Sequence, residues 1–183
     1  MILAMFSNFG GGTIAMILLA IVIGVYLYRL DKKEKSDPFA TLYKQYETLS
    51  TETLSSLSDD EAVRAVAVNI MAKTDKRHPD VYALFPVLSH GRIAVYSIWL
   101  LCNELKTADL AAVMHSPSAV FVPHAADGLS LIGASDSAAA LTAFLKSPDT
   151  TDAEAVTQSL QTDDPLSRCV AYIRDNPSEF VDL

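Results

Sequence analysis

The longest apolar stretch of the chain lies close to its first residue. Residues 13–28 read TIAMILLAIVIGVYLY and contain no charged side chain. A helix over residues 10–28 would be about 28 Å long, which matches the hydrocarbon thickness of a bilayer. The pattern therefore predicts a transmembrane helix at residues 13–28, preceded by a short extracytoplasmic N-terminus at residues 1–12.

Basic residues follow this run at once, and none precedes it. Arg29, Lys32, Lys33 and Lys35 lie in a juxtamembrane linker at residues 29–36. Because positive charge is retained on the cytoplasmic side, we expect the N-terminus outside and residues 37–183 in the cytoplasm. A cleaved signal peptide would instead carry its positive charges before the apolar stretch. The prediction is a single-pass protein of the cell membrane.

From residue 37 onward, apolar residues recur at helical spacing, and the alternation that marks strands is missing from the sequence. We expect an all-α domain of about eight helices over residues 37–183. Local signals place several helix ends, namely the capping boxes Ser58–Glu61 and Thr151–Glu154 and a left-handed cap at Gly133. The expected helices cover residues 37–49, 58–73, 86–105, 107–115, 119–132, 135–146, 151–161 and 164–176.

The helix expected at residues 86–105 should lie in the core of this domain. Its stretch from Ile93 to Cys102 is apolar on nearly all sides, but it is too short for a second membrane span. Cys102 and Cys169 are the only cysteines, and both have apolar neighbours. Two buried, reduced thiols suit a cytosolic compartment, whereas a disulfide would require the domain to face outward.

Charge is distributed unevenly along the chain. The sequence has 14 Lys and Arg and 22 Asp and Glu, and residues 29–35 hold four of the basic and two of the acidic ones. The remainder, with ten basic and twenty acidic residues, argues against direct contact with nucleic acid. An acidic surface serves solubility or faces a basic protein partner. The candidate partner-binding carboxylates cluster at helix starts: Asp59, Asp60, Glu61, Asp149, Asp152, Glu154, Asp163 and Asp164.

Motifs for catalysis are missing from the sequence. It lacks a His-Glu-x-x-His pair, a Gly-x-Ser-x-Gly elbow and a glycine-rich phosphate loop, so we expect no metal and no cofactor. An enzyme remains an alternative if His90, Glu104, His115 and His124 converge on one polar pocket. A third alternative is an accessory subunit whose anchor pairs with another membrane helix through Ala20 and Gly24.

Two segments resemble a known family. Residues 122–134, VPHAADGLSLIGA, resemble the A-P-E-A-x-E-A-L-x-x-I-G-A run of a bacterial all-helical family, and residues 170–180 resemble its closing helix. This is the DNA-mimic-protein-nineteen-like family, most of whose members have no assigned function. Residues 107–110 and Ser116 depart from the family's Asn-Gly-Gly-Phe stretch and its later Asn.

The resemblance covers about residues 85–181. It implies a helical domain, able to form a homodimer, whose acidic surface occupies a basic, DNA-binding partner. Together with the apolar run, it leads to one hypothesis: a membrane-tethered acidic helical module that binds a protein partner and does not turn over a substrate.

Overall fold

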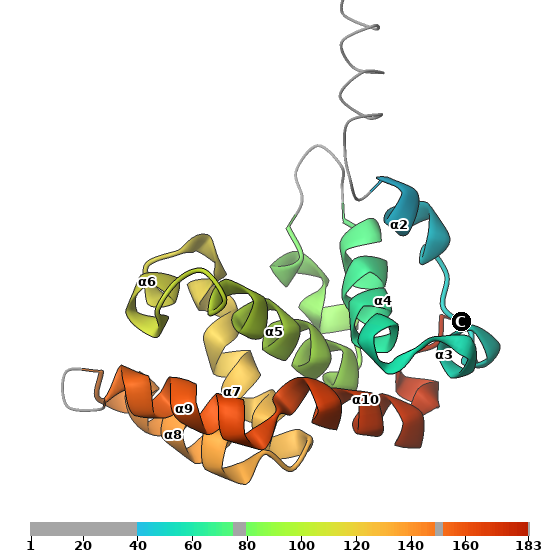
Figure 1. The fold of residues 1–183 in the computed structure, drawn as a ribbon. Helices are drawn as coiled ribbons and strands as arrows, with labels where there is room; N and C mark the ends of the chain where they lie inside the picture. Colours follow the sequence, from blue (N-terminus) through green and yellow to red (C-terminus); the bar gives the residue numbers. More distant parts are fainter. Residues whose placement is uncertain (1–39, 75–79, 149–151, 183) are drawn as a thin grey trace, which may run out of the picture. The chain divides into compact units, whose positions relative to one another are not determined.

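The computed structural model describes residues 40–74, 80–148 and 152–182, and within these ranges it is entirely helical (Figure 1). The predicted all-α class is confirmed for this part of the chain. Residues Tyr43–Leu183 form one compact unit. The helices are α2 (Ala40–Gln45), α3 (Thr51–Ser56), α4 (Asp59–Ala72), η2 (Tyr82–Val87), α5 (His90–Glu104), α6 (Leu110–Met114), η3 (Pro117–Phe121), α7 (Val122–Leu131), α8 (Ser135–Lys146), α9 (Ala153–Asp163), α10 (Pro165–Asp175) and η4 (Pro177–Glu179).

Helix α5 runs through the middle of the unit and packs against α4, α7 and α10 (Figure 1). Val95 and Ile98 at its centre have no exposed surface. The helix was expected from Pro86, but it begins only at His90, because Ser89 adopts an extended backbone and its hydroxyl accepts a hydrogen bond from the Arg92 amide. Pro86 belongs instead to η2, a helix that the sequence pattern did not predict.

The crossing of α5 and α7 is unusually close. A Cβ atom placed on Gly128 would lie 2.9 Å from both the Cα and the Cβ of Ala94, and 3.2 Å from Cδ1 of Ile98. Such separations leave no room for a side chain on α7. The two smallest residue types therefore allow the backbones of the two helices to approach each other.

Helix α7 ends where the sequence predicted. Gly133 has a φ of 76°, in the left-handed region that glycine adopts without strain. Its amide donates to the carbonyl of Ser130 at 3.2 Å, and the Ala134 amide donates to the carbonyl of Leu129 at 2.8 Å. These two bonds form a Schellman motif, which turns the chain into α8.

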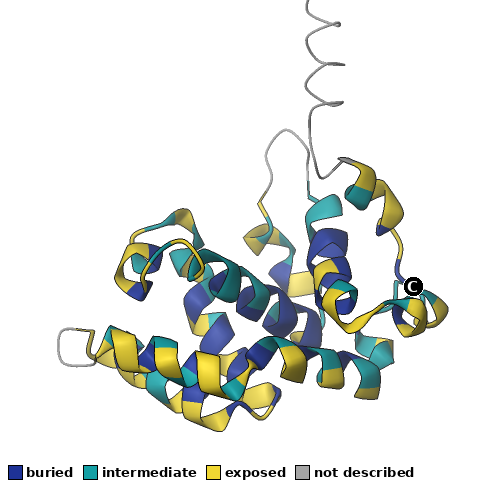
Figure 2. Ribbon diagram, viewed as in Figure 1, coloured by how far each residue is buried: buried dark blue, intermediate teal, exposed yellow. Residues whose placement is uncertain are grey.

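Helices α8 and α9 pack against each other as a hairpin whose outward surfaces are largely exposed (Figure 2). Ser135 was expected to cap α8, but the cap comes from the other arm of the hairpin. The Asp163 carboxylate accepts the Ser137 amide at 2.9 Å. Asp164, with a φ of 46°, is both the last capping residue of α9 and the first of α10.

The first helical stretch differs most from expectation. One helix was predicted over residues 37–49, but within the described residues α2 ends at Gln45 and α3 begins after Ser50, whose hydroxyl accepts the Thr53 amide. Tyr46 and Leu49 are buried as the pattern indicated, although they lie between two helices and not on one. Elsewhere the Ser58–Glu61 capping box is confirmed at the start of α4.

Two further helices start two or three residues later than expected. Helix α6 starts later than expected, at Leu110, because Asp109 caps it through the Ala112 amide. The capping residue of α9 is Asp152 rather than Thr151, which lies outside the described residues.

Candidate functional site

The most buried charged group among the described residues is Arg92 on the first turn of α5, with 5% of its surface exposed. A buried guanidinium is tolerated only when its N–H groups find acceptors. Arg92 donates to Oδ1 of Asn69 and Oδ1 of Asp182, both at 2.8 Å. It also donates to the backbone carbonyls of Phe180, at 2.6 Å, and Glu179, at 3.2 Å.

Asp182 is the centre of this arrangement. Besides Arg92, its carboxylate accepts the Leu49 amide and the Asn69 side-chain amide at 2.9 Å each, and the Lys73 ammonium. Partial burial alone would raise the pKa of the Asp182 carboxyl. The hydrogen bonds from Lys73, Leu49 and Asn69 and the charge of Arg92 outweigh it and lower the pKa to about 2.

Glu179 and Phe180 are held just as specifically. The Glu179 carboxylate accepts the Gly91 amide and the Tyr172 hydroxyl, each at 2.8 Å. Burial, and next the hydrogen bond to Glu179 and its negative charge, raise the pKa of Tyr172 to about 12. Phe180 has no exposed surface, and its ring meets that of Tyr172 edge-on, with the centroids 6.2 Å apart.

We call this arrangement the Arg92 clasp and residues 177–182 the closing segment. The clasp consists of Leu49, Asn69, Lys73, Ser89, Gly91, Arg92 and Tyr172 on one side and the closing segment on the other. Its polar groups are bonded to one another, so the clasp recognises a chain segment and offers no free group for catalysis.

The four residues expected to line a polar pocket are not gathered into one. His90 is the first residue of α5 and Glu104 the last, fourteen positions later, so the helix separates them by about 21 Å. Glu104 accepts the hydroxyls of Ser116, at 3.1 Å, and Ser118, and so ties α5 to η3. His115 shares a hydrogen bond of 2.8 Å with the Ala111 carbonyl on its own helix.

His124 lies in an aromatic cluster with rings from η2. Its ring centroid is 4.9 Å from that of Phe85 and 5.9 Å from that of Tyr82. Phe121 and Tyr96 extend the cluster towards α5. Because Tyr82 is 48% exposed, the cluster reaches the surface of the molecule.

Several of the acidic candidates are used within the fold. Glu61 accepts the amide and the hydroxyl of Ser58, and these bonds, the hydroxyl first, lower the pKa of Glu61. Asp163 caps α8, and the Ser137 amide lowers its pKa. Asp164 accepts the Ser167 hydroxyl at 2.6 Å, and Asp59 lies 3.4 Å from the Arg174 guanidinium.

The remaining acidic candidates point outward or are not described. Asp60, Asp152 and Glu154 are exposed, and Asp149 lies outside the described residues. The Asp152 carboxylate also accepts the Glu154 amide at 2.8 Å.

The α8–α9 hairpin carries most of the excess negative charge. Residues 135–164 contain six acidic residues and one basic residue, a net −5 in a chain of net −8. The structure adds one exposed carboxylate that the sequence analysis did not single out, that of Asp136. Asp136 and Asp163 line an open depression of about 280 Å³ between α8 and α9, together with Gln158, Ser159 and Thr162.

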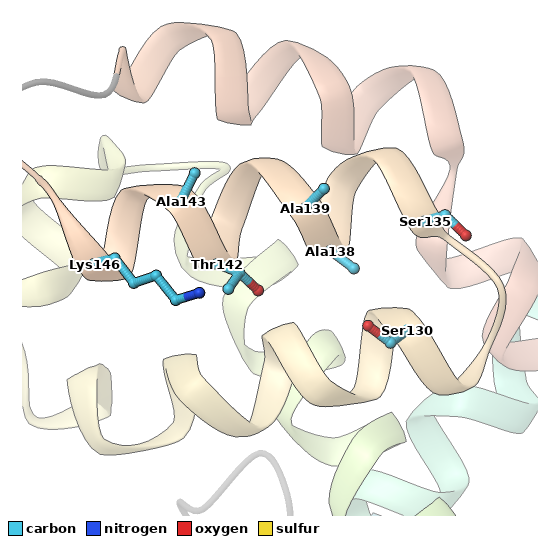
Figure 3. A pocket seen from close by; sticks show the side chains of 7 residues that line it. All are labelled: Ser130, Ser135, Ala138, Ala139, Thr142, Ala143 and Lys146. Atoms are coloured by element: carbon cyan, nitrogen blue, oxygen red, sulfur yellow. The ribbon is translucent and has the colours of Figure 1, made fainter.

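A second open depression, of about 430 Å³, lies on the other side of α8, towards α7. Figure 3 shows Thr142 and Lys146 reaching from α8 over this space, with Ser130 facing them from α7. Its floor is formed by small side chains. The side chains that line this depression supply one cation and several hydroxyls, but no carboxylate, imidazole or thiol.

The described part of the chain gives little support for a metal site or for a reactive cysteine. No group of three or more His, Cys, Asp or Glu residues is placed there to hold a metal ion. Both cysteines are free thiols. Burial raises the pKa of Cys102 to about 11 and that of Cys169 further, which makes both thiols poor nucleophiles.

Within residues 40–74, 80–148 and 152–182, no helix has the length and apolar character needed to cross a membrane. The predicted span at residues 13–28 lies outside these ranges. Comparison with protein-family models, curated proteins and solved structures gives no match. The family resemblance of residues 122–134 and 170–180 therefore stays a prediction.

The sequence analysis did not identify the clasp, although two of its members leave a signal. Asn69 is a polar residue within the apolar run of α4, and Arg92 is a charged residue directly before the apolar run of α5. A polar residue at a core position predicts a buried partner. Asp182 carries no such signal, because it lies beyond the last helix that the sequence predicts.

Proposed function

We propose that this chain is a membrane-tethered, acidic, all-helical protein-interaction module, whose α8–α9 hairpin contacts a basic surface of its partner. One observation carries the proposal: residues 135–164 concentrate six acidic residues against one basic residue. Charge of one sign concentrated in one segment attracts a partner of opposite charge over a distance of about 10 Å at 0.1 M salt.

The internal use of carboxylates supports the choice of this face. In the Arg92 clasp, Asp182 is paired with two cations and contributes little field outside. In the hairpin, Asp136, Asp152 and Glu154 are exposed. Asp136 and Glu154 lie in the first turns of α8 and α9, and Asp152 caps α9, so these helices determine where each carboxylate is presented to a partner.

The tether is the second part of the proposal. Residues 13–28 span the membrane, with the N-terminus outside and the acidic domain in the cytoplasm, a topology supported by the apolar run and the basic residues that follow it. The chain should remain in the membrane fraction after alkaline carbonate extraction. Its appearance in the soluble fraction would contradict the tether without affecting the interaction face.

The interaction face is tested with two matched double variants of the full-length, detergent-solubilised chain. Asp136→Asn with Glu154→Gln removes two charges from the hairpin, whereas Asp59→Asn with Asp60→Asn removes two from the start of α4. Proteins that co-purify with each variant are quantified by mass spectrometry. We expect the hairpin variant to lose its partner by about tenfold, and the α4 variant to retain most of it.

Two outcomes would contradict this assignment. Equal losses in both variants would show that overall charge, and not the hairpin, governs binding. Capture that is unchanged between about 0.05 M and 0.5 M salt would exclude an electrostatic contact, because exposed charges are screened over this range.

Mimicry of DNA, which the family resemblance implies, is a sharper form of the same proposal. The partner would then be a DNA-binding protein that uses one basic surface for both ligands. Added duplex DNA should release it from the immobilised chain in proportion to the DNA concentration. A partner that holds the chain and DNA at once would contradict mimicry while leaving the interaction module intact.

A further inference from the structure

The Arg92 clasp has the properties of a peptide-recognition groove that is occupied by a segment of the same chain. Each of three side chains of the closing segment is bound by its own set of groups. Glu179 is bound by the Gly91 amide and the Tyr172 hydroxyl, Phe180 is fully buried, and Asp182 accepts four donors. Val181 between them is half-buried. The groove therefore recognises a Glu-Phe-x-Asp pattern.

The backbone of the closing segment is bound as well. The Asp182 amide donates to the Leu49 carbonyl at 2.8 Å, and Ser89 donates its hydroxyl to the Glu179 carbonyl at 2.8 Å. Combined main-chain bonds and side-chain pockets are what proteins use to bind peptides. Apart from Tyr172, the residues that make these contacts are 87 or more positions away in sequence.

Helix α10 does not need the closing segment in order to end properly. The amide and the side-chain amide of Asn176 both donate to the Tyr172 carbonyl at 3.0 Å, so α10 is terminated by its own cap. Tyr172 thus stays with the body of the groove. The segment can leave by rotation at residues 176–178, which opens the short η4 turn but leaves α10 intact.

An empty groove would be unfavourable. Arg92 would lose its carboxylate partner and two backbone carbonyls, while Asn69, with no exposed surface, would lose the Asp182 oxygen. Arg92 and Lys73 on the groove both pair with the Asp182 carboxylate of the segment. The occupant of this groove must therefore be acidic and must carry an aromatic side chain at the second position.

We propose that this groove also binds a Glu-Phe-x-Asp segment in trans, and that the occupant is the closing segment of a second copy of this chain. Exchange of residues 179–182 then gives a dimer in which each copy completes the groove of the other. Three linking residues reach about 10 Å, so the two grooves face each other across the ends of the two α10 helices. This inference does not depend on the acidic hairpin.

The exchange competes with the segment of the same copy. A short linker keeps that segment at an effective concentration of about 1 mM, so exchange needs copies concentrated to a similar level. Two full-length variants separate the halves of the contact. Phe180→Ala with Asp182→Asn spoils the segment, whereas Gly91→Ala blocks the groove, since its Cβ would lie 2.5 Å from Oε2 of Glu179 and 3.0 Å from Cζ of Phe180.

Each variant alone should melt below the wild type and remain monomeric. In a mixture at about 1 mM, the intact segment of one variant fills the intact groove of the other. We expect a one-to-one heterodimer in native mass spectrometry and a fraction of the population with a melting temperature near that of the wild type. A melting curve equal to the sum of the separate curves, with no heterodimer, would overturn the proposal.

A second measurement uses the wild-type chain and does not depend on the folding of either variant. A fluorescent peptide of residues 177–183 is titrated against it and compared with peptides that carry Ala at position 180 or Asn at position 182. We expect saturable binding of the native peptide, and binding about tenfold or more weaker for the Ala peptide, from the lost burial of one aromatic side chain. Equal binding of all three peptides, or none up to about 10 mM, would overturn the proposal.

Discussion

The Arg92 clasp and the α8–α9 hairpin use the same residue types in opposite ways. In the clasp, the Asp182 carboxylate is surrounded by four donors and lies at a junction of sequence-distant segments. In the hairpin, Asp136 and Glu154 are exposed at helix starts, and their charge faces outward. A carboxylate in this fold is therefore structural or available according to its partners, and residue type alone does not distinguish the two.

The largest difference between the two regions is expected on removal of a charge. Arg92→Met should destabilise the fold by about 3–5 kcal/mol, because it removes one of the two cations from the half-buried Asp182 carboxylate and leaves the Phe180 carbonyl without the donor that Arg92 supplies. Urea unfolding followed by circular dichroism measures this loss. The matched control is Arg64→Met, whose guanidinium is 46% exposed and lies 3.9 Å from Glu61. A control loss above about 1 kcal/mol would remove the contrast between buried and exposed pairs.

The second effect concerns glycine. Gly91→Ala should cost about 1–3 kcal/mol, because the new methyl group would meet Glu179, Phe180 and Tyr172 at 3.0 Å or less. Gly133→Ala should cost about 1–2 kcal/mol for a different reason, since its φ of 76° is unfavourable although space around it is open. A second substitution separates the mechanisms: Glu179→Ala, which removes the 2.5 Å contact, should cost less stability when added to Gly91→Ala than when added to Gly133→Ala. Equal costs in the two glycine variants would show that the strain in Gly91→Ala does not come from its contact with Glu179.

The sequence predicts contacts between residues that are close together along the chain, but not contacts between distant ones. Local signals worked: the Ser58–Glu61 box, the Gly133 cap and the Asp164–Pro165 start are where the sequence placed them. Each involves groups only a few residues apart. The charge excess of residues 135–164 can likewise be read from the sequence alone.

The clasp could not be predicted in this way. Asp182 bonds to Leu49 across 133 positions and to Asn69 across 113, and no local pattern encodes such a pairing. The same contact explains the error in the first helix. The Leu49 amide is bound by a distant carboxylate, while Ser50 caps a new helix, so the apolar positions from Leu42 to Leu49 are divided between α2 and the connection that follows it.

The third effect is a pH dependence confined to the clasp. The pKa of Asp182 is about 2 in the folded chain and near 3.9 in an unfolded one, so the folded state binds this proton less readily. Its contribution is complete above about pH 4 and is lost as the pH falls towards 2. The stability difference between wild type and Asp182→Asn should therefore shrink over this interval. Glu61 and Asp163 shift in the same direction but cancel in the comparison.

A difference that stays constant from pH 7 to pH 2 would mean that the Asp182 charge contributes nothing to the clasp. Chemical denaturation at several pH values gives this difference directly. The measurement requires both proteins to remain two-state at low pH, which coincident circular dichroism and fluorescence transitions verify.

The smallest effect belongs to the hairpin. Asp136→Asn with Glu154→Gln should change the free energy of unfolding by less than about 0.5 kcal/mol, because both side chains are exposed. Thermal unfolding measures this change, and the same variant is the one expected to lose the protein partner. A large loss of stability would show that these carboxylates serve the fold, and would remove the distinction between the two regions.

The glycine that brings α7 against α5 also determines where solvent can reach. Because Gly128 of α7 lies against the backbone of Ala94, protein encloses the amides in the middle of α5 on several sides. In heavy water these amides should keep their protons until the whole unit unfolds, whereas the α8–α9 hairpin should exchange through local opening. Amide exchange is thus slow in the interior of the unit and fast in the α8–α9 hairpin, which also carries the most charge.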